Sequence, residues 1–184
     1  FVDNFDMPAV DDETVLQLIK EFPDLAAFLM NDGVRNILNN LKLLDKLLCN
    51  IKKIATLSQI GSPGETHLID FIWQEEIENT QYGIQKGAFL KIVAEKQADQ
   101  LLSGVSTADF DPANISMADE LKKAGFIKAE QQKIYFTHDL YSDWARYQLL
   151  LAHSEDLASF LTSKIILSPL WMKAIRLFGL NLLE

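Results

Sequence analysis

One stretch, residues 133–151, changes its apolar spacing partway along, and this change constrains the fold more than any other feature. Residues 133–137 alternate side chains in the manner of a strand. From Asp139 onward the apolar positions recur at helical spacing, at Leu140, Trp144, Tyr147, Leu150 and Leu151. We therefore predict a strand that runs directly into a helix, with His138 and Asp139 at the joint. Asp139 is expected to cap this helix, because a carboxylate accepts hydrogen bonds from the free amides of a first turn.

The segment before this joint supplies the other elements of a winged helix. A helical apolar pattern covers residues 84–103 and ends at Gly104. A loop at 106–114 and a short helix at 117–124 follow, and then two strands, 126–129 and 133–137, that flank a turn. Helix, short helix, hairpin and helix in this order predict a winged-helix domain at residues 83–153.

The chain on either side of this segment is predicted to be helical. Residues 1–82 form a helical domain, in which Ser62-Pro63-Gly64-Glu65 has the cap serine, first-turn proline and glutamate of a strong helix start. Residues 154–184 hold two C-terminal helices that lead to a next module. The predicted fold class is mainly α, a helical domain followed by a winged-helix domain with one small β-hairpin. Trp73, Trp144 and Trp171 fall at helical apolar positions and are expected in the core.

Charge and cysteine content narrow the possible partners. The 184 residues carry a net charge of −9, and residues 84–152 hold eight basic and nine acidic side chains. Nucleic acid is therefore an unlikely partner, because phosphate binding requires a clustered basic surface. The only cysteine, Cys49, lies in an apolar run and is expected to be a buried, inert thiol in a reducing compartment. No stretch reaches the ~18 apolar residues of a membrane span, so we expect a cytoplasmic protein. Because the sequence starts at Phe1 rather than at a methionine, we also expect it to be a piece of a larger protein.

The joint also carries a family resemblance. Phe136-Thr137-His138-Asp139-Leu140, followed by Asp143-Trp144-Ala145, resembles the Met-His-Asp motif of signal-transducing (STAND-type, NB-ARC-like) P-loop ATPases, in the form found in large bacterial members. In that family the motif closes a winged-helix domain, and its histidine reaches the β-phosphate of bound ADP. Thr137 stands where the plant proteins have Met. The resemblance implies that this chain is the helical and winged-helix regulatory region that follows the ATPase core.

The function implied by this resemblance is an ADP/ATP-dependent switch in signalling or defence. His138 would contact the ADP phosphate only together with the parent's ATPase core, so this segment has no cofactor of its own. Its partners would be that upstream core and a downstream sensor module, with self-association possible after exchange to ATP. We expect no catalysis by the segment alone, because it contains neither a Gly-rich Lys-Ser/Thr phosphate loop nor a Gly-x-Ser-x-Gly elbow.

Several alternatives remain open at this point. A metal centre at His138-Asp139 would need further ligands, and the only other histidines are His67 and His153. His138 could also satisfy a purely structural hydrogen bond. Asp143 and Arg146 are expected to be a solvated or capping pair rather than an acid–base dyad. For the whole chain, the rival functions are a winged-helix DNA-binding regulator and a plain helical protein-interaction module.

Overall fold

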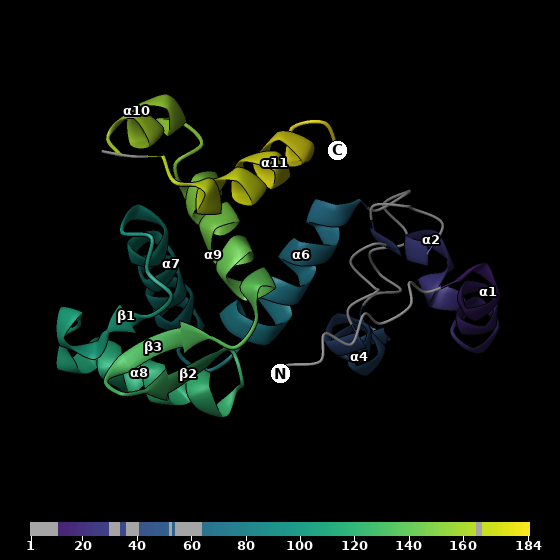
Figure 1. The fold of residues 1–184 in the computed structure, drawn as a ribbon. Coiled ribbons are helices and arrows are strands. Elements are labelled where there is room, and N and C mark those ends of the chain that lie inside the picture. The colour runs from purple at the N-terminus through teal and green to yellow at the C-terminus, as the bar shows by residue number, and fades with distance from the viewer. Residues whose placement is uncertain (1–10, 30–33, 36–40, 52, 54–63, 165–166) are drawn as a thin grey trace, which may run out of the picture. The chain divides into compact units, whose positions relative to one another are not determined.

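The computed structural model describes residues 11–29, 34–35, 41–51, 53, 64–164 and 167–184 (Figure 1). The chain divides into two compact units, one formed by residues 1–72 with Glu184 and the other by residues 73–183. The described residues are mostly helical, with one small antiparallel sheet. The prediction of a mainly α fold is therefore confirmed. No helix in the described ranges has both the length and the apolar character needed to cross a membrane.

The described elements of the first unit are helices. Its elements are α1 (Asp12–Glu21), η1 (Pro23–Leu25), α2 (Ala26–Leu29), α4 (Leu41–Cys49) and most of α6 (Glu65–Trp73). Asp11 begins α1, because its side chain accepts a 2.8 Å hydrogen bond from Thr14 N. The serine and proline of the predicted helix start at 62–65 lie outside the described residues, and α6 begins at Glu65.

The prediction of a buried Cys49 is wrong, because this thiol is exposed. Leu47, two residues earlier on α4, is fully buried. Successive helix residues are separated by about 100°, so two neighbours at this spacing lie on nearly opposite sides of a helix. An apolar run that covers one side of a helix therefore does not bury every member of the run.

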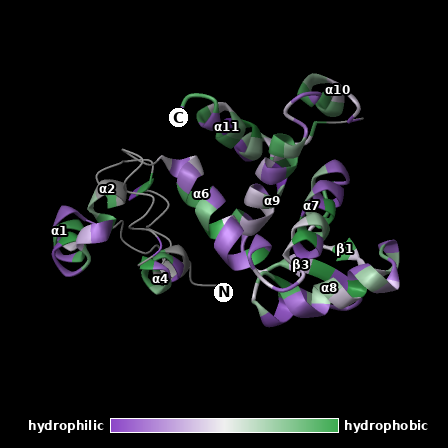
Figure 2. Ribbon diagram, turned by 180° about the vertical axis from the view of Figure 1, so that it is seen from behind, coloured by the Kyte–Doolittle hydropathy of each residue, from purple (hydrophilic) through white to green (hydrophobic). Residues whose placement is uncertain are grey.

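The second unit has a longer series of elements. It begins with the π-helical turn η3 (Gln74–Glu78), and its long helices are α7 (Gly83–Asp99), α8 (Pro112–Lys123), α9 (Asp139–Ala152) and α11 (Met172–Asn181). Shorter helices are η4 (Thr107–Asp109), α10 (Leu157–Thr162) and η5 (Pro169–Trp171). The strands are β1 (Val105–Ser106), β2 (Ile127–Glu130) and β3 (Lys133–Phe136). In Figure 2 hydrophobic and hydrophilic residues alternate around these helices, as expected for helices with one buried face.

The sheet has three antiparallel strands in the order β1-β3-β2, rather than the two-stranded hairpin that the sequence predicts. Ile134 in β3 pairs with Val105 on one side and with Ala129 on the other. Gln131 and Gln132 connect β2 to β3 with φ angles of 50° and 58°. Positive φ at both positions matches the twist of a two-residue hairpin turn. A two-residue strand such as β1 is too short to show a periodic pattern, which explains its absence from the prediction.

Helix α8 begins earlier than predicted, at Pro112 instead of residue 117. Asp111 caps it by accepting a 2.8 Å hydrogen bond from Asn114 N, and Pro112 occupies the first helical position. This Asp-Pro pair is a local start signal, and it outweighs the weak apolar pattern of the first helical turn.

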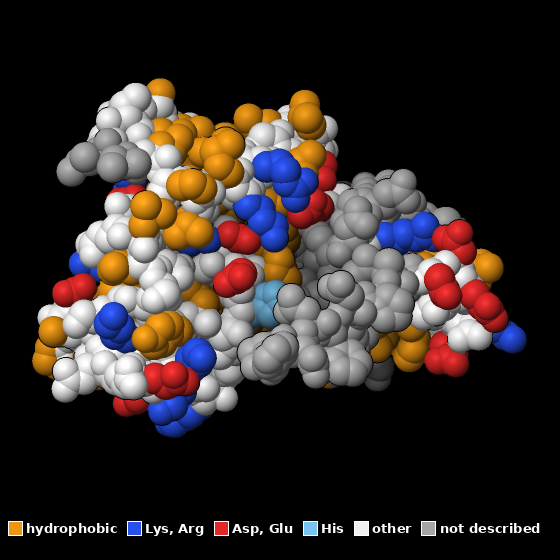
Figure 3. Space-filling model, in the orientation of Figure 1, with side chains coloured by type: hydrophobic (Ala, Val, Ile, Leu, Met, Phe, Trp, Pro, Cys, Tyr) orange, Lys and Arg blue, Asp and Glu red, His pale blue; other side chains and the backbone are white. Residues whose placement is uncertain are grey.

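The prediction that the three tryptophans lie in the core is confirmed. Trp73 and Trp144 are each 2% exposed, and Trp171 is fully buried. Figure 3 shows apolar side chains gathering over α10 and α11. Met172 at the start of α11 is exposed, as are Leu182 and Leu183 just after its end. The C-terminal helices thus contribute both to the core and to an apolar outer face.

A buried lysine attaches the C-terminal helices to α7. Lys164 Nζ contacts Glu95 and lies 2.8 Å from Asp99 Oδ2, while Trp171 Nε1 donates to Asp99 Oδ1 at 3.1 Å. The Lys164 ammonium also lies 4.4 Å from the centre of the Phe160 ring. Burial alone would lower the pKa of Lys164, but the hydrogen bonds to the two carboxylates outweigh it and raise the pKa.

Candidate functional site

The strand–helix joint forms as predicted, but a different residue caps the helix. β3 ends at Phe136 and α9 begins at Asp139. The cap is His138, whose Nδ1 accepts a 3.2 Å hydrogen bond from Leu140 N. The prediction that Asp139 caps α9 is therefore wrong by one residue. Asp139 lies in the first turn instead, where its negative charge favours the positive end of the helix dipole.

This cap indicates the tautomer of a neutral His138 ring. A ring nitrogen that accepts a hydrogen bond carries no proton, so neutral His138 has its proton on Nε2. The side chain is half-buried, and its ring meets the edge of Tyr141 at 6.3 Å between centroids. In the neutral ring, Nδ1 is thus the acceptor and Nε2–H is the donor.

Thr137, the residue before His138, is held in place by two hydrogen bonds. Its hydroxyl donates to Gly125 O at 2.7 Å, and its amide donates to Phe126 O at 3.0 Å. Gly125 has a φ of +80°, which is strained for any residue with a side chain. The threonine that replaces Met in the suspected motif therefore ties the end of β3 to the turn between α8 and β2.

Tyr141 lies one turn further along α9 and is 3% exposed. Its ring packs against Phe126 at 4.8 Å and against Trp144 at 5.9 Å between centroids. Burial, with a smaller contribution from the charge of Glu76, raises the pKa of Tyr141 from 10.0 to about 12.

The raised pKa of Tyr141 predicts a loss of stability in alkali. The unfolded chain releases this proton near pH 10 and the folded protein only near pH 12, so stability falls as pH rises between these values. One pKa unit corresponds to about 1.4 kcal/mol, which is the expected loss between pH 9 and pH 11. Tyr141→Phe should lack this loss, whereas Tyr82→Phe, at a half-exposed tyrosine, should retain it. Urea unfolding at the two pH values measures both, and an equal loss in parent and Tyr141→Phe would refute the prediction.

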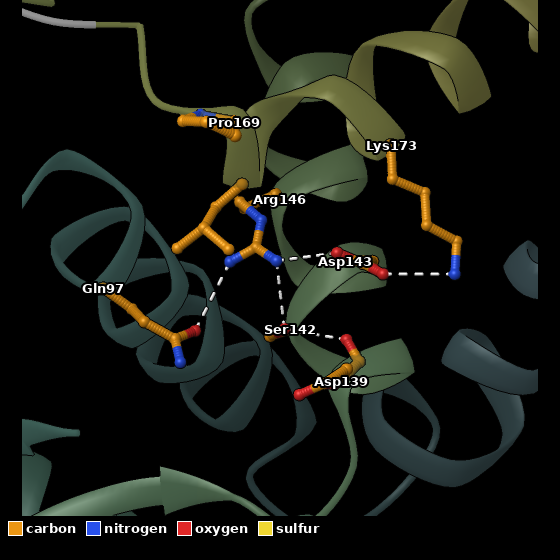
Figure 4. Close-up of a pocket in the computed structure, with 8 residues that line it drawn as sticks. Gln97, Asp139, Ser142, Asp143, Arg146, Pro169 and Lys173 are labelled. Atoms are coloured by element: carbon orange, nitrogen blue, oxygen red, sulfur yellow. Dashed lines mark hydrogen bonds and ion pairs between the residues drawn. The ribbon is translucent and has the colours of Figure 1, made fainter. Parts of the chain in front are cut away.

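A buried ion pair lies on the next turn of α9 (Figure 4). Arg146 is 1% exposed, and its Nη2 donates to Asp143 Oδ1 at 2.7 Å and to Ser142 Oγ at 3.0 Å. Its Nη1 points to Gln97 Oε1 of α7, at 3.4 Å. The prediction that Asp143 and Arg146 form a solvated or capping pair is wrong. Both α7 and α11 pack against α9, and together they cover the side of the helix that carries this pair.

The ion pair lines a pocket of about 280 Å³ in the second unit. Lys173 of α11 contributes Nζ, 3.2 Å from Asp143 Oδ2, and the Ser142 hydroxyl donates to the carbonyl of Asp139 at 2.7 Å. The lining residues are Gln97, Asp139, Ser142, Asp143, Arg146, Pro169, Leu170 and Lys173. Their two carboxylates and two cations cancel in charge, so the pocket does not favour a strongly charged ligand of either sign.

Sequence reasoning does not identify Gln97 or Lys173 as part of this cluster. Ser142, Asp143 and Arg146 share a helix face at spacings of three and four residues, a signal that the sequence does contain. Lys173 and Gln97 come from other helices, and no local pattern connects them to α9.

His153 lies too far from His138 to share a metal ion with it. His153 ends α9, about 20 Å from His138 along the helix at 1.5 Å per residue. It pairs instead with Asp156 Oδ1 at 3.0 Å and stacks on Phe160. His67 belongs to the first unit, on α6. Within the described residues, no three potential metal ligands cluster.

Comparison of the sequence with protein-family models finds no match, and neither do the searches of curated proteins and of solved structures.

Proposed function

We propose that this chain is a regulatory, non-catalytic segment of a signalling or defence ATPase of the STAND type. In this proposal the second unit contains a winged helix, and His138 reads the β-phosphate of ADP held by the ATPase core of the intact protein. The observation that carries the proposal is the cap at the start of α9. Because Leu140 N donates to Nδ1, the proton of the neutral ring is on Nε2, and Nε2–H is the atom that would donate to a phosphate oxygen.

The order of elements supports the winged-helix part of the proposal. Helix α7, strand β1, helix α8 and the hairpin of β2 and β3 follow one another, and β3 lies in the centre of the sheet. His138 follows the central strand directly, so its position depends on the sheet and on α9 together. This arrangement suits a residue that must report on the position of a whole domain.

The expected strength of the contact suits a switch. A hydrogen bond to a charged group contributes ~1.5–3 kcal/mol net, which corresponds to roughly 10- to 100-fold in preference for the closed state. Such a contact biases a two-state equilibrium without fixing it. Exchange of ADP for ATP would then release the winged helix from the core and permit self-association.

His138→Ala in the intact parent protein is expected to release ADP about 10- to 100-fold faster than the parent, by the same free energy. The measurement is the dissociation rate of a fluorescent ADP analogue, together with the nucleotide content of the purified protein. His138→Asn separates phosphate contact from capping, because asparagine caps a helix well but is shorter than histidine. Both substitutions should accelerate release, while His153→Ala at the far end of α9 should not.

Other outcomes would favour the alternative functions. Equal ADP retention in all these proteins would reject the role of His138 and favour a plain helical interaction module. Salt-sensitive DNA binding without any bound nucleotide would favour the DNA-binding regulator. Helix α8 gives little support to the latter, because Lys123 is engaged with Glu120 at 2.8 Å, and Asp119 adds a further negative charge.

A further inference from the structure

A continuous chain of polar contacts joins α11 to the first turn of α9 (Figure 4). Lys173 Nζ lies 3.2 Å from Asp143 Oδ2, and the other carboxylate oxygen accepts from Arg146 Nη2. The same Nη2 donates to Ser142 Oγ, whose hydroxyl donates to the carbonyl oxygen of Asp139. Asp139 stands between His138 and Leu140, the two residues of the cap.

This chain of contacts is buried where it passes through α9. The exposed fractions are 3% for Ser142, 9% for Asp143 and 1% for Arg146. A buried polar group that loses its hydrogen-bond partner is left desolvated and unsatisfied, which is unfavourable. The position of each group in such a chain therefore depends on the position of the next. Lys173 differs from the others, because its side chain is 42% exposed. It is therefore the member that can be changed with the least risk to folding.

Lys173 and Arg146 share the carboxylate of Asp143. While Lys173 holds Asp143 Oδ2, Arg146 Nη2 is shared between Asp143 Oδ1 and Ser142 Oγ. Without Lys173, both carboxylate oxygens become available to Arg146, and a two-pronged pairing is the geometry that guanidinium and carboxylate groups favour. Arg146 would then withdraw from Ser142, and the Ser142 hydroxyl would lose the partner that orients it toward the Asp139 carbonyl.

We propose that Lys173, acting through Asp143, Arg146 and Ser142, is a positioning residue for His138. The position of α11 is thereby transmitted to the cap of α9, and a displacement of α11 weakens the cap. This inference rests on the proposed function for what His138 binds, whereas the transmission itself depends only on the contacts above. The pocket fits this role, because both of its cations pair with the Asp143 carboxylate.

The test is amide hydrogen exchange in the 184-residue chain, measured by NMR at Leu140 and, as an internal reference, at Leu150 of the same helix. Lys173→Met is expected to raise the exchange rate of Leu140 relative to Leu150 by about tenfold, the effect of losing one net hydrogen bond. Lys173→Arg retains a cation for Asp143 and should restore the parent ratio. Lys164→Met removes a different contact of the C-terminal segment, with Glu95 and Asp99 of α7, and it should leave the ratio unchanged.

Three results would overturn the proposal. One is a Leu140 to Leu150 ratio in Lys173→Met equal to that of the parent. A second is the same increase in Lys164→Met, which would indicate general destabilisation rather than a specific path. Ser142→Ala, which breaks the path nearest the cap, should reproduce the effect of Lys173→Met, and an unchanged ratio there would also reject it.

The same variants distinguish this inference from the proposed nucleotide switch. An altered Leu140 ratio in Lys173→Met, with no effect of His138→Ala on ADP release in the parent, would retain the positioning path and reject the switch. An unchanged Leu140 ratio in Lys173→Met, together with faster ADP release in His138→Ala, would retain the switch and reject the path.

Discussion

Replacement of Arg146 by Met is expected to destabilise the 184-residue chain by about 3–5 kcal/mol, the usual cost of removing one partner of a buried ion pair. The guanidinium is 1% exposed and donates to Asp143, Ser142 and Gln97, so its loss takes one hydrogen bond from each of three polar groups. Domains of this size are stable by only about 5–15 kcal/mol. The variant should therefore unfold at a much lower urea concentration, as followed by tryptophan fluorescence.

A matched pair on α8 provides the control for Arg146→Met. Lys123 and Glu120 have the same spacing of three residues and a 2.8 Å contact, but their side chains are 74% and 39% exposed. Exposed pairs contribute little, because water screens them, so Lys123→Met should leave the unfolding midpoint nearly unchanged. Equal midpoints for Arg146→Met and the parent would contradict the burial of the Arg146 pair.

A double variant separates lost charge pairing from lost packing. Asp143→Leu combined with Arg146→Met removes both buried charges and fills much of their volume with apolar groups. Such replacements are often neutral or stabilising, so the double variant should be more stable than Arg146→Met alone. If the double variant is the less stable of the two, the loss arises from packing rather than from a buried Asp143 carboxylate that no longer pairs with Arg146.

Replacement of Trp171 by Ala is the second large effect, with an expected loss of about 3–5 kcal/mol. Trp171 is fully buried, meets the edge of Phe160 at 5.8 Å between ring centroids, and donates through Nε1 to Asp99. Its removal creates a cavity and also takes a hydrogen bond from a carboxylate that holds Lys164. Met172→Ala, at the adjacent and 60% exposed position, is the control and should have a small effect.

The form of unfolding in Trp171→Ala tests whether the C-terminal helices are integral to the second unit. Because Trp171 joins η5 to α7, the whole of residues 73–183 should lose stability in one cooperative transition. Amide exchange resolves this residue by residue. Faster exchange confined to α10 and α11, with α7 and α9 unchanged, would show instead that these helices unfold as a separate element.

The amino-acid sequence by itself determined the features that depend on neighbours a few residues away. The change of spacing around His138 places the strand and the helix, and the apolar spacing places Trp144 and Trp171 in the core. These signals are local, because strand and helix periods and turn residues act within a single element. The start of α8 at Asp111-Pro112 is also local, although the prediction placed it five residues too late.

Tertiary structure decided which of these side chains are exposed to solvent and which contact each other. The sequence contains the Asp143 and Arg146 pair, but its burial follows from the packing of α7 and α11 on α9. Lys173 reaches Asp143 only because α11 returns to that side of α9. Strand β1 exists through its pairing with β3, and Cys49 is exposed although its neighbour Leu47 is not. Burial and long-range pairing depend on how whole elements pack, and no window of consecutive residues contains that information.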